Sequence, residues 1–301
     1  MRYLVTGARG FAGRHLVYHL RKLGHGVIAW DREDCDLLKI RRTKDKIASL
    51  KPEGIFHLAA PQTSVGQSWK DRIGTITDNR QATLSVLVAA SSLNPKPKVF
   101  FTSSAEVLGN AGSEPLAETT PTHPLNPYAL SKVEGEELCR HYWKNFGVPV
   151  VIVRAFNHIG PGQPKDFVFS NFARQIARIE EGSGVGEILV SNLAARRDFT
   201  DARDMVVAYS TLMERGIPGE IYHAGSGKSW SIREILEMLL DLSPAQIKIV
   251  VDPDRFRPND IPEQKCDPAK IKALGWKPKI PLTQTLTDIL EDARDKVKQD
   301  S

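Results

Sequence analysis

Residues 1–31 read MRYLVTGARGFAGRHLVYHLRKLGHGVIAWD, and this stretch decides the fold. A short apolar run at residues 3–5 leads into three glycines spaced three apart within residues 7–13. Leucines at helical spacing follow as far as Gly24, and a second apolar run then covers residues 27–30. Strand, glycine turn, helix and strand in this order form the start of a βαβ unit, which feeds a parallel sheet.

The same alternation of apolar runs and helix-period segments continues through the first half of the chain. Residues 54–59, 99–103 and 148–153 read as further strands, and residues 81–92 and 128–146 read as helices between them. Strands that alternate with helices form parallel sheets covered on both faces. The sequence therefore predicts an α/β protein with a Rossmann-type doubly wound parallel sheet.

The regular alternation of strand and helix patterns ends after Arg154. A Gly- and Pro-rich run, GPGQP at 160–164, breaks the pattern, and a segment with helical apolar spacing follows it. Further along, Ser231 and Glu234 form a capping box that opens another helix. We predict a Rossmann domain and a smaller C-terminal α/β substrate-binding region. The first covers 1–156, with 196–226 returning to it, and the second covers 157–195 and 227–301.

The composition is that of an ordinary folded protein. Of 301 residues, 41 are Lys or Arg and 36 are Asp or Glu, which gives a formal net charge of +5. With 26% charged and 41% hydrophobic residues, disorder across the whole chain is excluded. Because the basic residues are interspersed with acidic ones, we expect no binding to nucleic acid.

The cysteines and the apolar runs indicate the cellular compartment. Cys35, Cys139 and Cys266 form no CxxC pair, which argues against a disulfide framework and against a zinc site. No apolar run reaches the roughly 20 residues of a membrane helix, and no signal-type segment follows Met1. We expect a cytoplasmic protein that needs no metal and does not associate with a membrane.

The glycine turn predicts a phosphate-binding loop. Gly7, Gly10 and Gly13 allow backbone N–H groups to approach a pyrophosphate, and the start of the following helix attracts anions. The spacing is GxxGxxG rather than the GxGxxG of the usual dinucleotide fingerprint. An ordinary turn from strand to helix is the alternative interpretation.

Asp31 bears on which dinucleotide binds. It ends the second strand, 18 residues after Gly13, where a carboxylate accepts both ribose hydroxyls of an adenosine and repels a 2′-phosphate. This favours NAD over NADP. Arg9 and Arg32 flank the same position and could hold a phosphate, so NADP stays open as the alternative.

Tyr128, Lys132 and Ser104 form a candidate acid–base group. Tyr128 and Lys132 lie four apart at the start of a helix, so both project from one face. A nearby ammonium favours phenolate and is expected to lower the pKa of the tyrosine from about 10. Ser104 ends a predicted strand, where ligands dock in open α/β sheets, and its hydroxyl could hold a carbonyl. The alternative is a surface tyrosine beside a solvated lysine.

These motifs together resemble a known family. The glycine loop, HLAA at 57–60, Ser104 and YALSK at 128–132 occur in the order found in the extended short-chain dehydrogenase/reductases, which act mainly on nucleotide sugars. The resemblance implies Tyr128 as catalytic acid/base, Lys132 as the residue that tunes its pKa and anchors the nicotinamide ribose, and Ser104 as a donor to the carbonyl. It also implies a homodimer through the helices at 81–92 and 128–146.

The resemblance and the loop chemistry together predict the cofactor site. Asn79 would help to order the active site, and residues 57–60 would pass along the cofactor. The full predicted set is Gly7, Arg9, Gly10, Phe11, Gly13, Asp31, Arg32, Leu58, Ala59, Ala60, Asn79, Tyr128 and Lys132.

The second half resembles the branch of this family that acts on GDP-mannose derivatives. The segments that carry the likeness are RAFNHIGPGQ at 154–163, NL at 192–193, RRDFTDARD at 196–204 and FRPNDIP at 256–262. By this likeness Arg197 and Arg257 would hold the diphosphate and Asp260 the nucleotide ribose, and guanidinium groups suit two phosphates well. Asn157 and Asn192 complete the predicted contacts to a GDP-sugar. Structural ion pairs with neighbouring acids are the alternative for the arginines.

Glu106 divides the remaining hypotheses. Related dehydratases have Thr-Ser-Glu where this chain has Ser104-Ala105-Glu106, and their glutamate removes a carbon proton during loss of water. We favour the reductase reaction, in which NAD(P)H reduces a 4-keto sugar and Tyr128 donates the proton. A dehydratase or epimerase with Glu106 as base, and a sensor without catalysis, are the alternatives. Leu108 departs from the tyrosine that is usual in this family.

Overall fold

The fold is described from a computed structural model for residues 1–61, 65–112, 114–182, 184–252 and 261–300. Within them, six strands form one parallel sheet in the order β2-β1-β3-β4-β5-β9. The strands are β1 (Arg2–Thr6), β2 (Gly26–Trp30), β3 (Gly54–His57), β4 (Lys98–Ser104), β5 (Val150–Ala155) and β9 (Ile221–Ala224). The predicted parallel α/β sheet is confirmed. The strand order reverses at β1, which places a ligand crevice at the carboxyl ends of β1 and β3.

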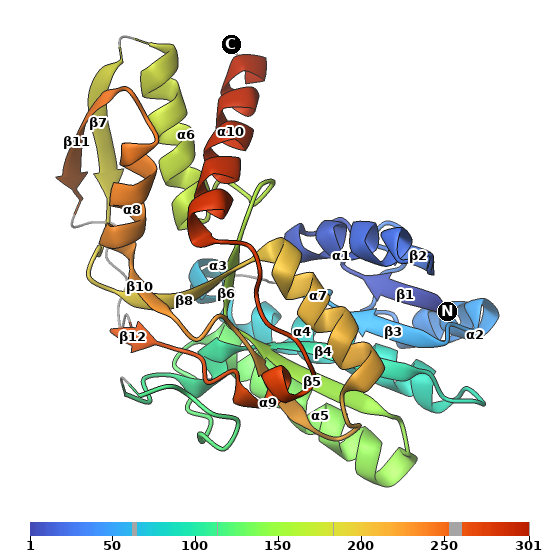
Figure 1. Ribbon diagram of the computed structural model, residues 1–301. Helices are drawn as coiled ribbons and strands as arrows, with labels where there is room; N and C mark the ends of the chain where they lie inside the picture. Colours follow the sequence, from blue (N-terminus) through green and yellow to red (C-terminus); the bar gives the residue numbers. More distant parts are fainter. Residues whose placement is uncertain (62–64, 113, 183, 253–260, 301) are drawn as a thin grey trace.

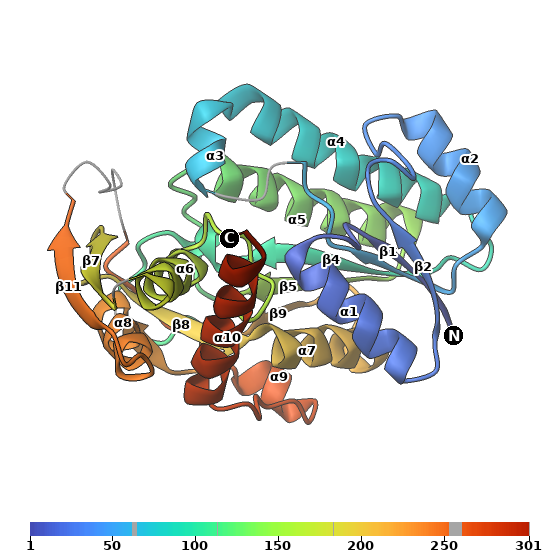
Figure 2. The same ribbon diagram turned by 90° about the horizontal axis from the view of Figure 1, so that it is seen from above.

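Helices cover both faces of this sheet (Figure 2). On one face lie α1 (Phe11–Lys22) and α7 (Ala202–Arg215), whose buried residues Leu16 and Tyr209 join one apolar cluster with β1 and β5. On the other lie α2 (Ile40–Leu50), α4 (Arg72–Ser91) and α5 (Pro127–Phe146), which contribute to a second cluster. The short helix α3 (Val65–Lys70) precedes α4, and the 3₁₀ helix η1 (Ala105–Leu108) follows β4.

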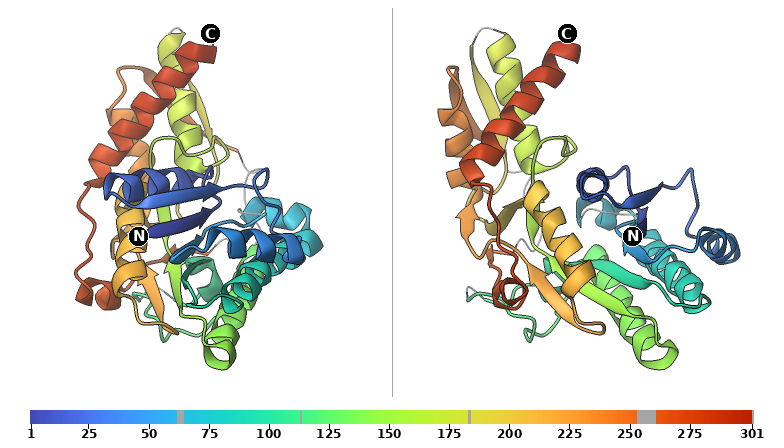
Figure 3. Two further views of the ribbon diagram at one scale, coloured as in Figure 1. Left: turned by 90° about the vertical axis from the view of Figure 1, so that its right-hand side faces the viewer. Right: turned by 45° about the vertical axis from the view of Figure 1, so that its right-hand side comes forward.

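The second region lies beyond the carboxyl end of β5 (Figure 1). Its helices are α6 (Val168–Glu181), α8 (Ile232–Asp241) and α10 (Leu282–Asp300), and its strands are β6 (Asn157–Ile159), β7 (Val185–Val190), β8 (Arg196–Asp201), β10 (Ser229–Ser231), β11 (Gln246–Val251) and β12 (Glu263–Gln264). β11 pairs with β7, while β8 pairs with β6, β10 and β12. The helices α6 and α10 pack side by side (Figure 3). This region buries its own apolar cluster, which includes Phe169 and Leu290.

Local signals account for several of these boundaries. Asn126 caps the start of α5, followed by Pro127 in the first turn, and the helix ends at Gly147, whose φ of 62° suits glycine. Ser231 and Glu234 form the predicted capping box at α8. α4 begins nine residues earlier than predicted, at Arg72, because its N-terminal half has little apolar periodicity to reveal it.

The chain passes between the two regions more than once. β8 belongs to the second region, whereas α7 and β9 lie with the large sheet. Later still, α9 (Ala269–Ala273) and the following loop bring Ile271 and Trp276 into the core formed by α1 and α7. The two-domain division predicted from sequence stays an interpretation. No helix in the described part of the chain is both long and apolar enough to span a bilayer.

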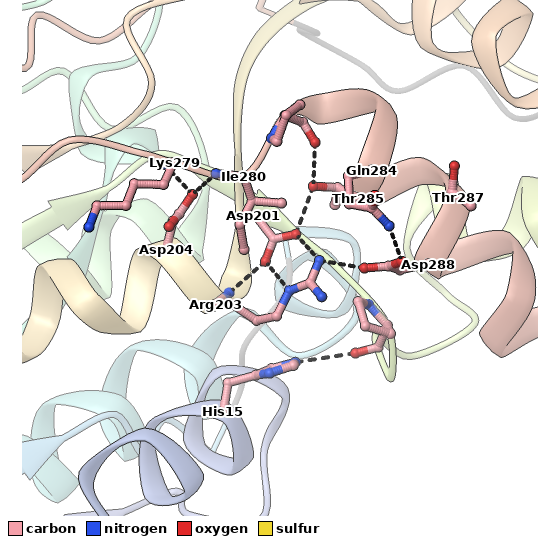
Figure 4. A network of polar contacts seen from close by, with 12 residues as sticks. His15, Asp201, Arg203, Asp204, Lys279, Ile280, Gln284, Thr285, Thr287 and Asp288 are labelled. Atoms are coloured by element: carbon pink, nitrogen blue, oxygen red, sulfur yellow. Dashed lines mark hydrogen bonds and ion pairs between the residues drawn. The ribbon is translucent and has the colours of Figure 1, made fainter. Parts of the chain in front are cut away.

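A polar network joins α10 to the junction of β8 and α7 (Figure 4). Arg203 donates from Nε and Nη2 to the carboxylate of Asp201 at 2.9 and 2.7 Å, and its Nη2 lies 2.6 Å from Asp288 on α10. The hydroxyl of Thr285 also donates to Asp201, at 2.7 Å. We call Asp201, Arg203, Thr285 and Asp288 the α10 clamp. It fixes a C-terminal helix to the strand that carries Arg197.

Candidate active site

The glycine turn has the close packing that a phosphate-binding loop needs. Gly7 has a φ of 71°, and a Cβ there would lie 2.9 Å from the nitrogen of Ala59. A Cβ on Gly13 would lie 2.0 Å from the oxygen of Gly7. Gly10 occupies the N-cap of α1 and has no side chain to cover the first amides of the helix. The turn therefore presents main chain to an anion at the positive end of α1.

A cavity of about 430 Å³ opens beside this turn. The predicted cofactor residues that line it are Gly7, Arg9, Gly10, Asp31, Arg32, Leu58, Ala59 and Ala60. It is also lined by Cys35, Leu37, Leu38, Asp78 and Ala82, which sequence reasoning missed. Leu37 and Leu38 follow the second strand by only a few residues, and that proximity is the signal that could have found them. The cavity has the mixed apolar and polar lining of a cofactor site.

The arginines at this cavity differ in their partners. The guanidinium of Arg9 lies 2.5 Å from Glu33 and 3.7 Å from Asp34. Arg32 is exposed, and its backbone nitrogen donates to the carboxylate of Asp31 at 2.9 Å. Arg9 therefore already has two anionic partners, both from the segment that follows β2.

The remaining predicted cofactor residues do not line this cavity. Phe11 stacks on His158 of β6, with ring centroids 5.9 Å apart, and so faces the second region. Asn79 is buried on α4 and donates to the hydroxyl of Ser131 at 2.9 Å. That hydroxyl donates in turn to the carbonyl of Tyr128 at 2.7 Å. Asn79 therefore acts on the backbone that carries the tyrosine.

Tyr128, Ser104 and Lys132 come together at the end of β4 and the start of α5. The expectation that Lys132 lowers the pKa of Tyr128 is wrong. Burial and the charge of Glu106 raise the pKa of Tyr128 to about 12, and only a hydrogen bond with Ser104 lowers it. The Nζ of Lys132 lies 5.7 Å from the centre of the Tyr128 ring and donates to the carbonyl of Thr102 at 2.8 Å. Burial lowers the pKa of Lys132 to about 8.

Glu106 is held beside this group by a residue that sequence reasoning missed. The amide Nδ2 of Asn126 donates to Oε2 of Glu106 at 3.0 Å. The backbone nitrogen of Glu106 donates to the hydroxyl of Ser104 at 3.2 Å. The signal that could have found Asn126 is its position directly before Pro127 and Tyr128, where a capping residue is expected. Glu106 and Ser104 are therefore fixed to each other and to the helix that carries Tyr128.

Leu108 belongs to the core. It is fully buried and joins a cluster with Val107, Leu116 and Phe156. The departure from the family's usual tyrosine therefore puts an apolar side chain into packing behind the site.

The predicted substrate residues lie on the strands of the second region and their connections. Asn157 is exposed on β6, which pairs with β8, the strand that carries Arg197. Arg197 donates from Nη1 to the carbonyl of Arg196 at 2.8 Å, and the side chain of Asn192 accepts from the nitrogen of Ala194 at 2.9 Å. The structure brings Asn157 and Arg197 onto adjacent strands. The predicted contacts Arg257 and Asp260 lie outside the described residues.

The carboxylates near Arg197 accept hydrogen bonds from other residues. Asp198 is buried and accepts from the backbone nitrogens of Ser226 and Gly227 at 2.8 and 2.7 Å. Asp201 is engaged by the α10 clamp, and Asp204 accepts from the backbone nitrogens of residues 279 and 280, each at 2.7 Å. These contacts weaken the alternative in which Arg197 serves a structural ion pair with one of them.

Comparison with known proteins agrees with this architecture. The profile of the NAD dependent epimerase/dehydratase family matches residues 3–225. The chain is 35% identical to a GDP-6-deoxy-D-mannose reductase of Pseudomonas aeruginosa, over 99% of both chains. It is 30% identical to GDP-mannose 4,6 dehydratase 1 of Arabidopsis thaliana, over 87% of this chain and 71% of the relative. The solved structure of RMD from Pseudomonas aeruginosa complexed with NADPH matches with a TM-score of 0.88 and 34% identity, covering 98% of this chain and 99% of that one.

Proposed function

This chain belongs to the NAD dependent epimerase/dehydratase family, and from that premise we propose that it reduces the 4-keto group of GDP-4-keto-6-deoxy-D-mannose to give GDP-D-rhamnose. It is an NAD(P)-dependent enzyme of the kind that acts on nucleotide sugars. The observation that carries the proposal is that Tyr128 and Lys132 on α5 meet Ser104 at the carboxyl end of β4, where ligands dock in such sheets. The end-to-end similarity to a GDP-6-deoxy-D-mannose reductase supports the substrate.

The residues present fit a dinucleotide. Gly7 and Gly13 pack too tightly against neighbouring main chain to accept a Cβ, and Gly10 leaves the start of α1 without a side-chain cap, where a pyrophosphate would bind. Asp31 lines the same cavity and would accept the hydroxyls of the adenosine ribose. When bound, the reduced nicotinamide supplies the hydride that the ketone carbon takes up.

In the proposed reaction Tyr128 supplies the proton. Reduction turns the ketone oxygen into an alkoxide, and the O–H bond of Tyr128 breaks as its proton passes to that oxygen. Because its pKa lies near 12, the phenol is protonated at neutral pH and can act as an acid. Ser104 would donate a hydrogen bond to the same oxygen as its charge develops. The Ser104 hydroxyl would stabilise the phenolate that remains, while Lys132 would anchor the ribose of the nicotinamide.

The dehydratase stays the second candidate because Glu106 is a carboxylate beside Tyr128. Loss of water requires a base at the carbon and an acid at the departing hydroxyl. The residue between Ser104 and Glu106 is Ala105, which is buried and offers no proton. Asn126 also occupies one oxygen of Glu106. These two observations favour the reductase.

For the cofactor we propose that NADH is preferred over NADPH. A 2′-phosphate would meet the carboxylate of Asp31 and would have to displace Glu33 from Arg9. The exposed Arg32 leaves NADPH usable.

We also propose a homodimer built on α4 and α5, which pack closely against each other. Ile73 on α4 and Leu130 on α5 are exposed apolar side chains, as a surface buried by a second copy requires. Light scattering coupled to gel filtration would give twice the mass of one chain, and a single-chain mass would contradict the dimer.

The reaction is tested by mixing the protein with GDP-4-keto-6-deoxy-D-mannose and NADH or NADPH, and following the absorbance of the reduced nicotinamide. We expect stoichiometric loss of signal and formation of GDP-rhamnose. No loss, together with conversion of GDP-mannose to its 4-keto-6-deoxy form without added reductant, would contradict the reductase and support the dehydratase with Glu106 as base.

A further inference from the structure

Asn126 makes two contacts that lead to different parts of the active site. Its Oδ1 accepts from the backbone nitrogen of Ala129 at 2.8 Å and so caps α5. Its Nδ2 donates to Glu106 at 3.0 Å. One amide group therefore spans from the helix that carries Tyr128 to the carboxylate on η1.

Without Asn126 these two parts would be joined less directly. Glu106 lies in the 3₁₀ helix after β4, and Tyr128 lies on α5, after a loop of about 20 residues. The Glu106 side chain is partly buried, so its carboxylate needs donors to offset the water it has lost. Asn126 supplies one such donor and leaves the second oxygen of Glu106 for another partner.

We propose that Asn126 is a positioning residue, which holds the Glu106 carboxylate at the substrate pocket so that its second oxygen accepts a hydroxyl of the hexose ring. The inference rests on the proposed function, because it makes Glu106 a substrate-orienting acceptor and not a base. A ring hydroxyl bound at this point would fix the sugar relative to the proton of Tyr128. The charge of Glu106 favours the protonated phenol that the reduction consumes.

The two contacts of Asn126 can be separated by substitution. In Asn126→Ser the hydroxyl keeps the cap, because serine and asparagine are comparable at this position. The shorter side chain has no amide to reach Glu106. Asn126→Asp also keeps the cap oxygen but turns the donor into a second carboxylate oxygen, which repels Glu106. Glu106→Gln removes the charge that Asn126 holds.

The test is a double-mutant cycle in the reduction assay. We expect Asn126→Ser to lower kcat on the order of tenfold, the loss typical of a hydrogen bond to a charged group, and Asn126→Asp to lower it further. The KM for NADH should not change. In the Glu106→Gln background Asn126→Ser should have a smaller effect, about threefold or less, because the bond that glutamine can still accept no longer involves a charge.

Three results would overturn the inference. Equal losses of kcat in both backgrounds would mean that Asn126 acts through α5 alone, and a raised KM for NADH would point the same way because Lys132 lies on that helix. An unchanged kcat in Asn126→Ser would mean that Glu106 needs no such support.

The proposed function can fail separately. If the wild-type protein does not reduce the ketosugar, that proposal is wrong, and the wild type, Asn126→Ser, Glu106→Gln and the double variant are then compared by thermal unfolding. Non-additive shifts in Tm would support the link between Asn126 and Glu106. Additive shifts would overturn it.

Discussion

One side of the candidate site relies on main-chain atoms, and the other side relies on side chains. On the cofactor side, Gly7 and Gly13 let main chain pack against main chain, and Gly10 leaves the start of α1 uncovered, so their contribution is the absence of a side chain. On the proposed substrate side, Arg197, Asn157 and Glu106 would contribute charged or polar groups from separate elements. The contrast teaches that the cofactor side is sensitive to added atoms, whereas the substrate side is sensitive to their removal.

The largest effect is expected where the two sides meet. Tyr128→Phe removes the proton donor and should lower kcat by a factor on the order of 10² to 10⁴. Binding of GDP-sugar, measured by calorimetry, should be largely kept. Unchanged turnover would end the assignment of Tyr128 as the acid.

The cofactor side is tested by adding one carbon. In Gly13→Ala the new Cβ would lie 2.0 Å from the oxygen of Gly7, so the turn must move. We expect overpacking to lower the free energy of unfolding by about 1–3 kcal/mol. The affinity for NADH should fall by an order of magnitude or more. Fluorescence titration with NADH measures the binding. Gly24→Ala is the control for an added methyl group, since nothing lies within 4 Å of a Cβ there, although its φ of 80° also costs stability. Wild-type NADH affinity in Gly13→Ala would show that the turn tolerates a side chain.

The pH dependence separates Tyr128 from Lys132. With its pKa lowered to about 8, Lys132 loses its charge above that pH, while Tyr128 stays protonated to about 12. We expect kcat/KM to fall about tenfold per pH unit above pH 8. In Lys132→Arg this fall should begin at higher pH, because the charge of arginine persists. A flat profile up to pH 10 would contradict this role of Lys132.

Lys132 also makes stability depend on pH. Its folded-state pKa lies below the unfolded value of about 10.5, so the unfolded chain binds more protons between about pH 8 and 10.5. This group alone therefore makes the free energy of unfolding rise with pH across that window. Urea unfolding of the wild type and of Lys132→Met at both ends of the window would isolate the contribution.

The substrate side is tested by removing one guanidinium. Arg197→Ala should raise the KM for the GDP-sugar about tenfold and leave the KM for NADH unchanged, because a diphosphate loses a charge-assisted contact. Arg196→Ala is the matched control, since Arg196 pairs with Glu234 at 3.1 Å and should affect Tm rather than KM. Equal effects of both variants on the KM would mean that Arg197 has no special contact with the substrate.

The smallest effect is expected at the rim of the cofactor cavity. Glu33→Gln removes the anion that pairs with Arg9, so Arg9 can turn to a 2′-phosphate. We expect affinity for 2′,5′-ADP to rise a few-fold relative to 5′-ADP, as fits an exposed ion pair. No change in this ratio would mean that Arg9 does not reach the phosphate.

The sequence predicted the sheet well because its signals are local. The glycine turn at residues 7–13 and the apolar run at 27–30 are each contained in a few residues, and the parallel sheet that they predict is confirmed. The Leu37 and Leu38 wall of the cavity follows from how the chain folds back after β2, which no periodicity reports.

The sequence predicted which residues form the candidate acid–base group, but it did not predict the pKa of Tyr128. The spacing of Tyr128 and Lys132 places both on one helix face, but the pKa of Tyr128 depends on burial and on Glu106, which reaches it from another element. The bond between Asn126 and Glu106 joins residues 20 apart and could not be found from either segment alone.

Under the proposed role of Arg197, the α10 clamp connects helix α10 to substrate affinity. β8 carries Arg197 near one end and Asp201 at the other, and Asp201 is tied through Arg203 and Thr285 to α10. An extended strand transmits a displacement at one end to the other. A purification tag or a truncation that disturbs α10 would therefore alter affinity for the nucleotide sugar, so tagged protein is better built with the addition at the N-terminus, beside the edge of the sheet far from this strand.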